Sequence, residues 1–150
     1  MPITPDSRIL CVDDDRDARE MLSELLKLSG ISCVCARSAK EASSLMDSQR
    51  FDLYLLDAWL PELDGFEFCR QIRLVDSTTP IVFYSGAAYD TDRQKGIAAG
   101  ANAYLVKPDV EYLIEVIPSL IAEARVVEMK PRFTAIDLMK HANQQAGSIG

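Results

Sequence analysis

The sequence has little of what several protein classes require. It contains a single histidine, His141, and its four cysteines do not form paired C-x-x-C motifs, so a structural zinc site is not indicated. Its uninterrupted apolar runs are far shorter than the ~20 residues that cross a bilayer. The first ten residues, MPITPDSRIL, lack the basic and apolar regions of a secretory signal. We therefore expect a cytoplasmic protein with no membrane contact.

Positive charge is also scarce. Lysine and arginine together number 16 against 23 aspartates and glutamates, which gives a formal charge of −7. Binding to a nucleic-acid backbone needs clustered basic side chains, so we expect no direct contact with nucleic acid. The acidity is typical of a solvated surface unless several carboxylates meet at one site.

The cysteines are Cys11, Cys33, Cys35 and Cys69, and we interpret them as buried free thiols of a reducing compartment. Cys33 and Cys35 fall on the same face of a predicted strand. Two thiolates are too few for a metal site, so this pattern favours packing in the core.

Short β-rich apolar runs alternate with helical patterns over about the first 125 residues. Strands are predicted at residues 8–12, 31–35, 51–56, 81–84 and 103–106. Ser38, Asp64 and Asp109 are expected to cap helices, and a helix around residues 92–99 is expected to stop at Gly100. This order predicts an α/β fold with a doubly wound, five-stranded parallel sheet in the flavodoxin-like order 2-1-3-4-5.

The predicted domain covers residues 1–125, and residues 126–150 form a C-terminal extension or tail. The tail has too few apolar residues for a second core, so no output domain is expected. It could extend the last helix, dock on the domain, mediate dimerisation or begin a further domain. The sequence alone leaves these alternatives open.

Chemically active side chains directly follow four of the predicted strands. They are Asp13-Asp14-Asp15, Asp57, Ser85-Gly86 and Lys107-Pro108. In doubly wound folds the site lies at the carboxyl ends of the strands, so these groups are expected to meet. Crowded carboxylates repel one another unless a cation neutralises them, and oxygen ligands suit Mg²⁺ or Mn²⁺. The lysine and serine suggest a phosphoryl group beside the metal. Asp15 is interpreted as a helix cap and left out of the site.

The chain resembles the receiver domains of two-component signalling over about residues 7–125. The matching stretches are Ile9-Leu-Cys-Val-Asp-Asp14, Asp52-Leu-Tyr-Leu-Leu-Asp57, Leu60-Pro-Glu-Leu-Asp-Gly65, Pro80-Ile-Val-Phe-Tyr-Ser-Gly86 and Ala99-Gly-Ala-Asn-Ala-Tyr-Leu-Val-Lys-Pro108. Each motif alone is moderately specific. Together, in order and at strand ends, they make a chance match improbable.

The resemblance implies a signalling phosphoacceptor rather than an enzyme. Asp57 would take a phosphoryl group from a phosphohistidine of a partner, either a sensor histidine kinase or a histidine phosphotransfer protein. Asp13 and Asp14 would bind Mg²⁺, one directly and the other through water, together with Asp57 and the backbone carbonyl of Trp59. Lys107 and Ser85 would contact the phosphoryl oxygens.

The same resemblance implies a conformational switch made by Ser85 and Tyr104. The serine hydroxyl would move towards the phosphoryl group and the tyrosine ring would turn inward. A downstream protein target would read the surface of helix four, strand five and helix five, which could also form a homodimer. The Lys107-Pro108 bond is expected to be cis. We also predict that Trp59 slows self-dephosphorylation, because its bulk lies where a hydrolysing water must approach.

Three alternative functions fit the sequence less well. An aspartyl-phosphate phosphohydrolase would resemble a D-x-D pattern, but Trp59 occupies the position of the second aspartate. A flavodoxin-like cofactor binder would need a first loop that accepts phosphate, which Asp13 and Asp14 would repel. A degenerate receiver, signalling only through protein contact, is disfavoured by the intact acidic pair, acceptor and lysine.

Overall fold

The computed structural model describes residues 7–129. Residues 130–150, which hold His141 and most of the predicted tail, lie outside the described residues. Strands and helices alternate along the described chain. They are β1 (Arg8–Val12), α1 (Arg16–Leu28), β2 (Ser32–Ala36), α2 (Ala39–Ser48), β3 (Leu53–Leu56), α3 (Gly65–Val75), β4 (Ile81–Ser85), α4 (Asp90–Ala99), β5 (Ala103–Val106) and α5 (Val110–Met129). Among these helices, none combines the length and apolar character needed to span a membrane.

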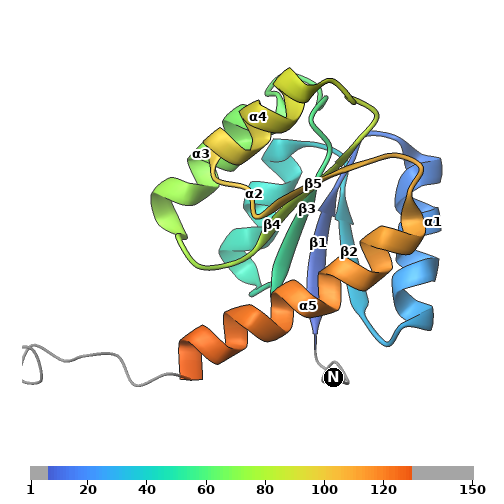
Figure 1. Ribbon diagram of the computed structural model, residues 1–150, viewed down its shortest axis with the longest axis vertical. Helices are drawn as coiled ribbons and strands as arrows, with labels where there is room; N and C mark the ends of the chain where they lie inside the picture. Colours follow the sequence, from blue (N-terminus) through green and yellow to red (C-terminus); the bar gives the residue numbers. More distant parts are fainter. Residues whose placement is uncertain (1–6, 130–150) are drawn as a thin grey trace, which may run out of the picture.

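The five strands form one parallel sheet in the order β2-β1-β3-β4-β5. This confirms the predicted fold class and strand order. Helices cover both faces, so the sheet has two apolar cores (Figure 1). One core packs α2, α3 and α4 against the sheet, and the other packs α1 and α5. Burial on both faces explains why β3 is apolar throughout and β4 is apolar up to Ser85.

The predicted helix caps are confirmed. The side chains of Asp15, Ser38 and Asp64 accept hydrogen bonds from backbone N–H groups in the first turns of α1, α2 and α3. The Asp109 carboxylate accepts from the N–H of Tyr112 at 3.2 Å at the start of α5. Each cap satisfies a donor that the helix itself leaves unpaired. Asp15 therefore acts as a cap, as the sequence indicated.

Several boundaries differ from the prediction: β3 begins two residues later than predicted, at Leu53, and β2 and β4 each end one residue later. β2 begins at Ser32 because Ile31 still belongs to the end of α1, where its N–H donates to Leu26 O at 2.9 Å. α4 begins at Asp90, since Asp92 lies within the first turn and accepts from the N–H of Tyr89 at 3.2 Å. α5 continues to Met129, so residues 126–129 extend the last helix, which is one of the alternatives that the sequence left open.

Candidate functional site

The predicted site residues from four strands meet at the carboxyl edge of the sheet. Asp13 and Asp57 directly follow β1 and β3, Ser85 ends β4, and Lys107 directly follows β5. The Lys107 ammonium lies 2.7 Å from Asp13 Oδ2 and 3.1 Å from Asp57 Oδ2. Residues separated by 94 and 50 positions in the chain are thus joined by one cation. Parallel pairing accounts for this, because it brings the carboxyl ends of the strands to one edge.

Asp57 is held in the centre of this group. Its backbone N–H donates to Val12 O at 2.9 Å, so the ladder between β1 and β3 extends to the start of the site. Its Oδ1 accepts from Ser85 Oγ at 2.9 Å and from the N–H of Trp59 at 3.1 Å. The residue is only 8% exposed, whereas the Trp59 side chain is 64% exposed. Hydrogen bonds from Ser85 and Trp59 therefore orient a carboxylate that is largely buried.

Asp13, Asp14 and Asp57 form an acidic cluster in which one carboxylate oxygen of each lies within 4.8 Å of the others. Asp13 is 2% exposed and Asp14 lies on the surface. The pKa of Asp13 is raised from its usual 3.8, because burial disfavours the charged form and Asp57 adds like charge, while Lys107 and the Asp15 N–H only partly offset this. Oxygen donors in such a cluster suit Mg²⁺, which would supply the positive charge that one lysine does not.

Lys107 is also held by its surroundings. Its backbone N–H donates to Ser85 O at 2.9 Å, and its ammonium lies 5.8 Å from the centre of the Tyr84 ring. Burial opposes its charge, but the hydrogen bond to Asp13 and the charges of Asp57 and Asp13 outweigh this, so the pKa of Lys107 is raised. The Lys107-Pro108 bond is cis, as expected.

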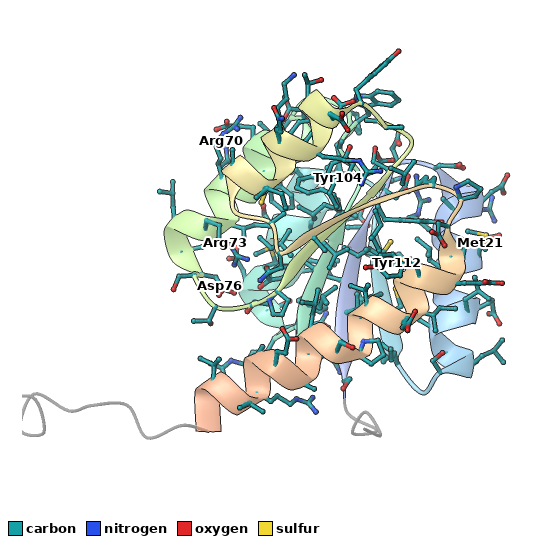
Figure 2. All side chains as sticks on the ribbon, in the orientation of Figure 1. Met21, Arg70, Arg73, Asp76, Tyr104 and Tyr112 are labelled. Carbon is teal, nitrogen blue, oxygen red and sulfur yellow. The ribbon has the colours of Figure 1, made fainter. Side chains whose placement is uncertain are left out.

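Ser85 and Tyr104 are linked through the loop after β4. The Ala87 N–H donates to Ser85 Oγ at 3.2 Å, and the Tyr104 hydroxyl donates to Ala87 O at 2.6 Å. The Tyr104 ring points into the protein beneath α4 (Figure 2) and stacks on Phe83 with ring centroids 5.5 Å apart. A Cβ atom at Gly96 would lie 2.7 Å from this ring, so glycine in α4 makes room for it. In this structure the Tyr104 ring is therefore in the inward position.

Two residues that position the site were not singled out from the sequence. Gly65, the first residue of α3, donates its N–H to Ala58 O at 2.8 Å, and a Cβ there would collide with the backbone carbonyl oxygen of Asp57. Arg19 of α1 donates from Nη1 to Asp13 O at 2.9 Å. Gly65 ends one of the matching sequence motifs, which was a usable signal. Arg19 carried none, because its contact depends on the direction of a long side chain.

Comparisons with known proteins agree with this geometry. Residues 9–118 match the family model of the response regulator receiver domain. The response regulator MprA of Mycolicibacterium vanbaalenii is 43% identical over 101 residues, which are 67% of this chain and 44% of that protein. The chain therefore spans less than half the length of this curated relative.

Solved structures show the same fold. The receiver domain of the Francisella response regulator 1452 superimposes with a TM-score of 0.74 and 25% identity, covering 79% of this chain and 98% of that one. The chemotaxis response regulator CheY4 of Vibrio cholerae gives a TM-score of 0.71 and 31% identity, covering 76% and 98%. The chain belongs to the response regulator receiver domain family of two-component signalling. Receiver domains are signalling phosphoacceptors and generally bind Mg²⁺ at an acidic pocket.

Proposed function

We propose that the chain is a phosphorylation switch in which Asp57 accepts a phosphoryl group from the phosphohistidine of a partner protein. The observation that carries this proposal is the convergence of Asp57, Lys107 and Ser85 beside the acidic pair Asp13 and Asp14. The partner is a sensor histidine kinase or a histidine phosphotransfer protein.

In the proposed reaction an Asp57 oxygen bonds to phosphorus while the P–N bond of the phosphohistidine breaks, and the leaving imidazole takes up a proton. Lys107 offsets the charge of the transferred group, and Ser85 redirects its hydroxyl from Asp57 to a phosphoryl oxygen. A bound Mg²⁺, held by Asp13, Asp14, Asp57 and the Trp59 carbonyl, would neutralise charge on the phosphoryl oxygens. Such positioning and charge neutralisation are most of what phosphoryl transfer requires.

The signal would leave the site through the loop between β4 and α4. The N–H of Ala87 donates to the Ser85 hydroxyl, and the Tyr104 hydroxyl donates to the carbonyl oxygen of Ala87. A shift of the serine hydroxyl therefore alters a hydrogen bond of the same loop residue that holds the tyrosine ring. Exposed apolar side chains lie on the neighbouring helices, Ile97 on α4 and Tyr112 on α5. This favours the α4-β5-α5 face as the surface for a downstream protein or a second copy of the chain. The free thiols fit a cytoplasmic setting.

Phosphorylation can be tested by adding acetyl phosphate and Mg²⁺ to the purified chain and measuring its intact mass and the fluorescence of Trp59. We expect one labile phosphoryl adduct and a change in emission, because Trp59 adjoins the acceptor. Asp57→Asn should abolish both. Asp47→Asn, which changes an exposed aspartate of α2, is the matched control and should retain both. An adduct that persists in Asp57→Asn, or the absence of any adduct with Mg²⁺ present, would contradict the proposal.

A further inference from the structure

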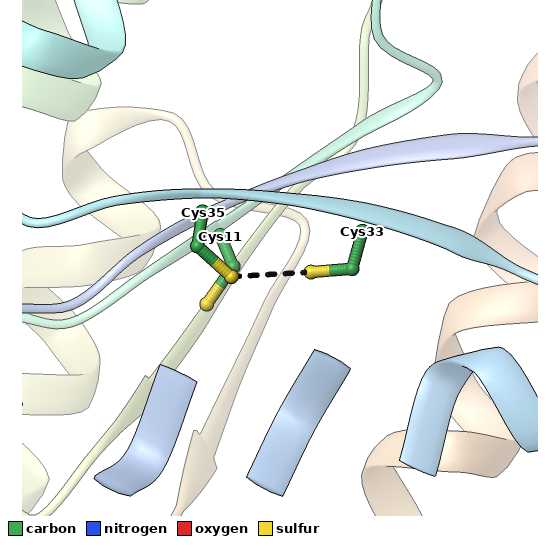
Figure 3. A group of neighbouring side chains, drawn as sticks. All are labelled: Cys11, Cys33 and Cys35. Carbon is green, nitrogen blue, oxygen red and sulfur yellow. Dashed lines mark hydrogen bonds between the residues drawn. The ribbon is translucent and has the colours of Figure 1, made fainter. Parts of the chain in front are cut away.

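A second cluster of metal-binding side chains lies away from the acidic site. Cys11 of β1 pairs in register with Cys35 of β2, and Cys33 points to the same face two residues earlier. The three sulfur atoms lie within 4.8 Å of one another, and those of Cys33 and Cys35 are 3.9 Å apart (Figure 3). The sequence suggested two thiols on one strand, and the strand register adds the third.

The only metal-ligating side chains in this cluster, among the described residues, are the three cysteines. No histidine, aspartate, glutamate or further cysteine of residues 7–129 joins the group. Cys35 Sγ also lies 3.8 Å from Arg19 O of α1, which covers this face of the sheet. Cys11 is buried, whereas Cys33 and Cys35 are half-buried. The cluster is therefore largely dry and short of a fourth protein ligand.

A route from solvent reaches the cluster. Cys33 lines an open pocket of about 380 Å³ between α1 and β2, together with Ser23, Lys27, Gly30 and Ser32. An ion could enter here without disrupting the sheet. Because this pocket lies beside the edge strand β2, it is separate from the strand-end rim that holds Asp57.

The spacing of the sulfur atoms fits one central ion. Metal–sulfur bonds of about 2.3 Å in a planar three-coordinate site place neighbouring sulfurs roughly 4.0 Å apart. Thiolates select soft ions, of which Cu⁺ accepts three ligands, whereas structural Zn²⁺ is almost always bound by four. We propose that Cys11, Cys33 and Cys35 form a three-sulfur binding site for Cu⁺.

Binding would exchange protons for metal without a change of oxidation state. Cu⁺ replaces the three thiol protons, which pass to solvent, and no electron moves. One ligand is already prepared for this exchange. The neighbouring sulfurs of Cys11 and Cys33, together with the positive charge of Arg19, outweigh the effect of burial and lower the pKa of Cys35.

The test uses the reduced full chain under anaerobic conditions, with Cu⁺ supplied from the chromophoric chelator bicinchoninate. We expect the chain to withdraw one equivalent, and X-ray absorption to show three sulfur neighbours at about 2.3 Å. Cys33→Ser and Cys35→Ser should each weaken binding by more than about a hundredfold, because loss of a direct ligand exceeds the loss caused by outer groups. Cys69→Ala, which removes a thiol without placing a hydroxyl in the core, is the control and should bind normally, since Cys69 lies in the other core, where its thiol donates to Ala99 O.

Circular dichroism of each variant separates loss of the site from loss of the fold. The half-buried positions 33 and 35 are used because serine at buried position 11 risks unfolding the chain. Full Cu⁺ affinity in the folded Cys33→Ser/Cys35→Ser double variant overturns the proposal, as does a spectrum with two sulfur neighbours. A Zn²⁺ ion held by all three thiolates that Cu⁺ does not displace overturns the choice of metal.

Discussion

Asp13 and Asp76 lie at opposite ends of the parallel sheet, and their surroundings shift their pKa values in opposite directions. Asp76 follows α3 (Figure 2) and precedes β4, so it lies at the amino end of the strands. Burial opposes its charge, but hydrogen bonds from Thr79, Thr78 and Tyr54 outweigh this and lower its pKa. At Asp13 the burial cost prevails and the pKa is raised.

The difference lies in the donors that each end supplies. Asp76 Oδ1 accepts from the N–H groups of Thr78 and Thr79 at 3.1 and 3.0 Å, and Oδ2 accepts from Tyr54 at 3.3 Å. Burial and the neighbouring carboxylate raise the pKa of Tyr54 to about 12, so the phenol remains a donor. No like charge stands among these donors. Asp13 instead shares one ammonium with Asp57. Hydrogen bonds therefore outweigh the burial cost of the Asp76 carboxylate, whereas at Asp13 they do not.

The largest expected effect is the response of the carboxyl end to Mg²⁺. A ligand that binds only the folded state at a hundred times its dissociation constant stabilises it by about 2.7 kcal/mol. We expect Mg²⁺ to raise the free energy of unfolding by about this amount in the unchanged chain and much less in Asp13→Asn. Without Mg²⁺ at pH 7, Asp13→Asn should be at least as stable as the unchanged chain, because the substitution removes a charge that burial disfavours.

Urea denaturation with and without Mg²⁺ measures both quantities. Ca²⁺-free buffers and a chelator control fix the metal-free state. If Asp13→Asn were strongly destabilising without metal, the carboxylate would be structural and the contrast with Asp76 would fail.

At the other end, Asp76→Asn should destabilise the fold by about 1.5 kcal/mol at pH 7, because hydrogen bonds to a charged acceptor are lost. The pH dependence has a definite sign. A lowered pKa means that the stabilisation is fully present above the usual value of 3.8 and is lost as the pH falls through the folded value. The two proteins should therefore converge in stability in acid. Asp47→Asn, on the exposed surface of α2, should change stability by less than about 0.5 kcal/mol.

Denaturation of these three proteins across a pH series provides the measurement. A gap between Asp76→Asn and the unchanged chain that stays constant into strong acid would show that the loss is unrelated to the charge.

Substitution of Trp59 tests whether a large side chain at the carboxyl end of the sheet affects the rate of dephosphorylation rather than the stability of the fold. The residue is 64% exposed, so Trp59→Asn should leave the free energy of unfolding within about 0.5 kcal/mol. We expect the lifetime of phosphorylated Asp57 to shorten about threefold, a barrier change of roughly 0.65 kcal/mol, because water reaches the phosphoryl group more easily. Trp59→Phe keeps much of the bulk and should retain most of the lifetime. Loss of the adduct is followed by intact mass, and an unchanged or longer lifetime in Trp59→Asn refutes the idea.

Most of the fold and the meeting of the site residues could be predicted from sequence for one physical reason. Parallel strands bring their carboxyl ends to one edge, so Asp13, Asp57 and Lys107 were expected to meet once the strands were located. What escaped prediction depends on details that the pattern does not contain. The third sulfur of the thiol cluster depends on the register that pairs Cys11 with Cys35.

The contacts of long side chains could not be predicted either, because they depend on the direction that the side chain takes in the folded protein. Arg73 of α3 donates to Gly100 O, Thr79 O and the Asn102 side chain, and so ties the amino end of the sheet together. Nothing in its local pattern distinguishes it from a solvated arginine. The predicted start of α4 is two residues late, because Asp92, the first residue of the predicted helix, lies within the first turn of the observed one.

The smallest expected effect, that of Gly86→Ala, is best measured against a second glycine at the opposite end of the sheet. Gly86 follows Ser85 at the carboxyl end, has no positive φ, and would have nothing within 4 Å of an added Cβ. Gly86→Ala should raise the free energy of unfolding by about 0.5 kcal/mol, because alanine restricts the unfolded chain at no cost to the folded one. Gly30 also has open space but a φ of +79°, so Gly30→Ala should lower stability, by about 1 kcal/mol. If Gly86→Ala is more stable but is phosphorylated more slowly, glycine at this position lowers stability in return for movement of the loop beside Ser85. If Gly86→Ala is less stable, glycine is already the more stabilising residue at this position.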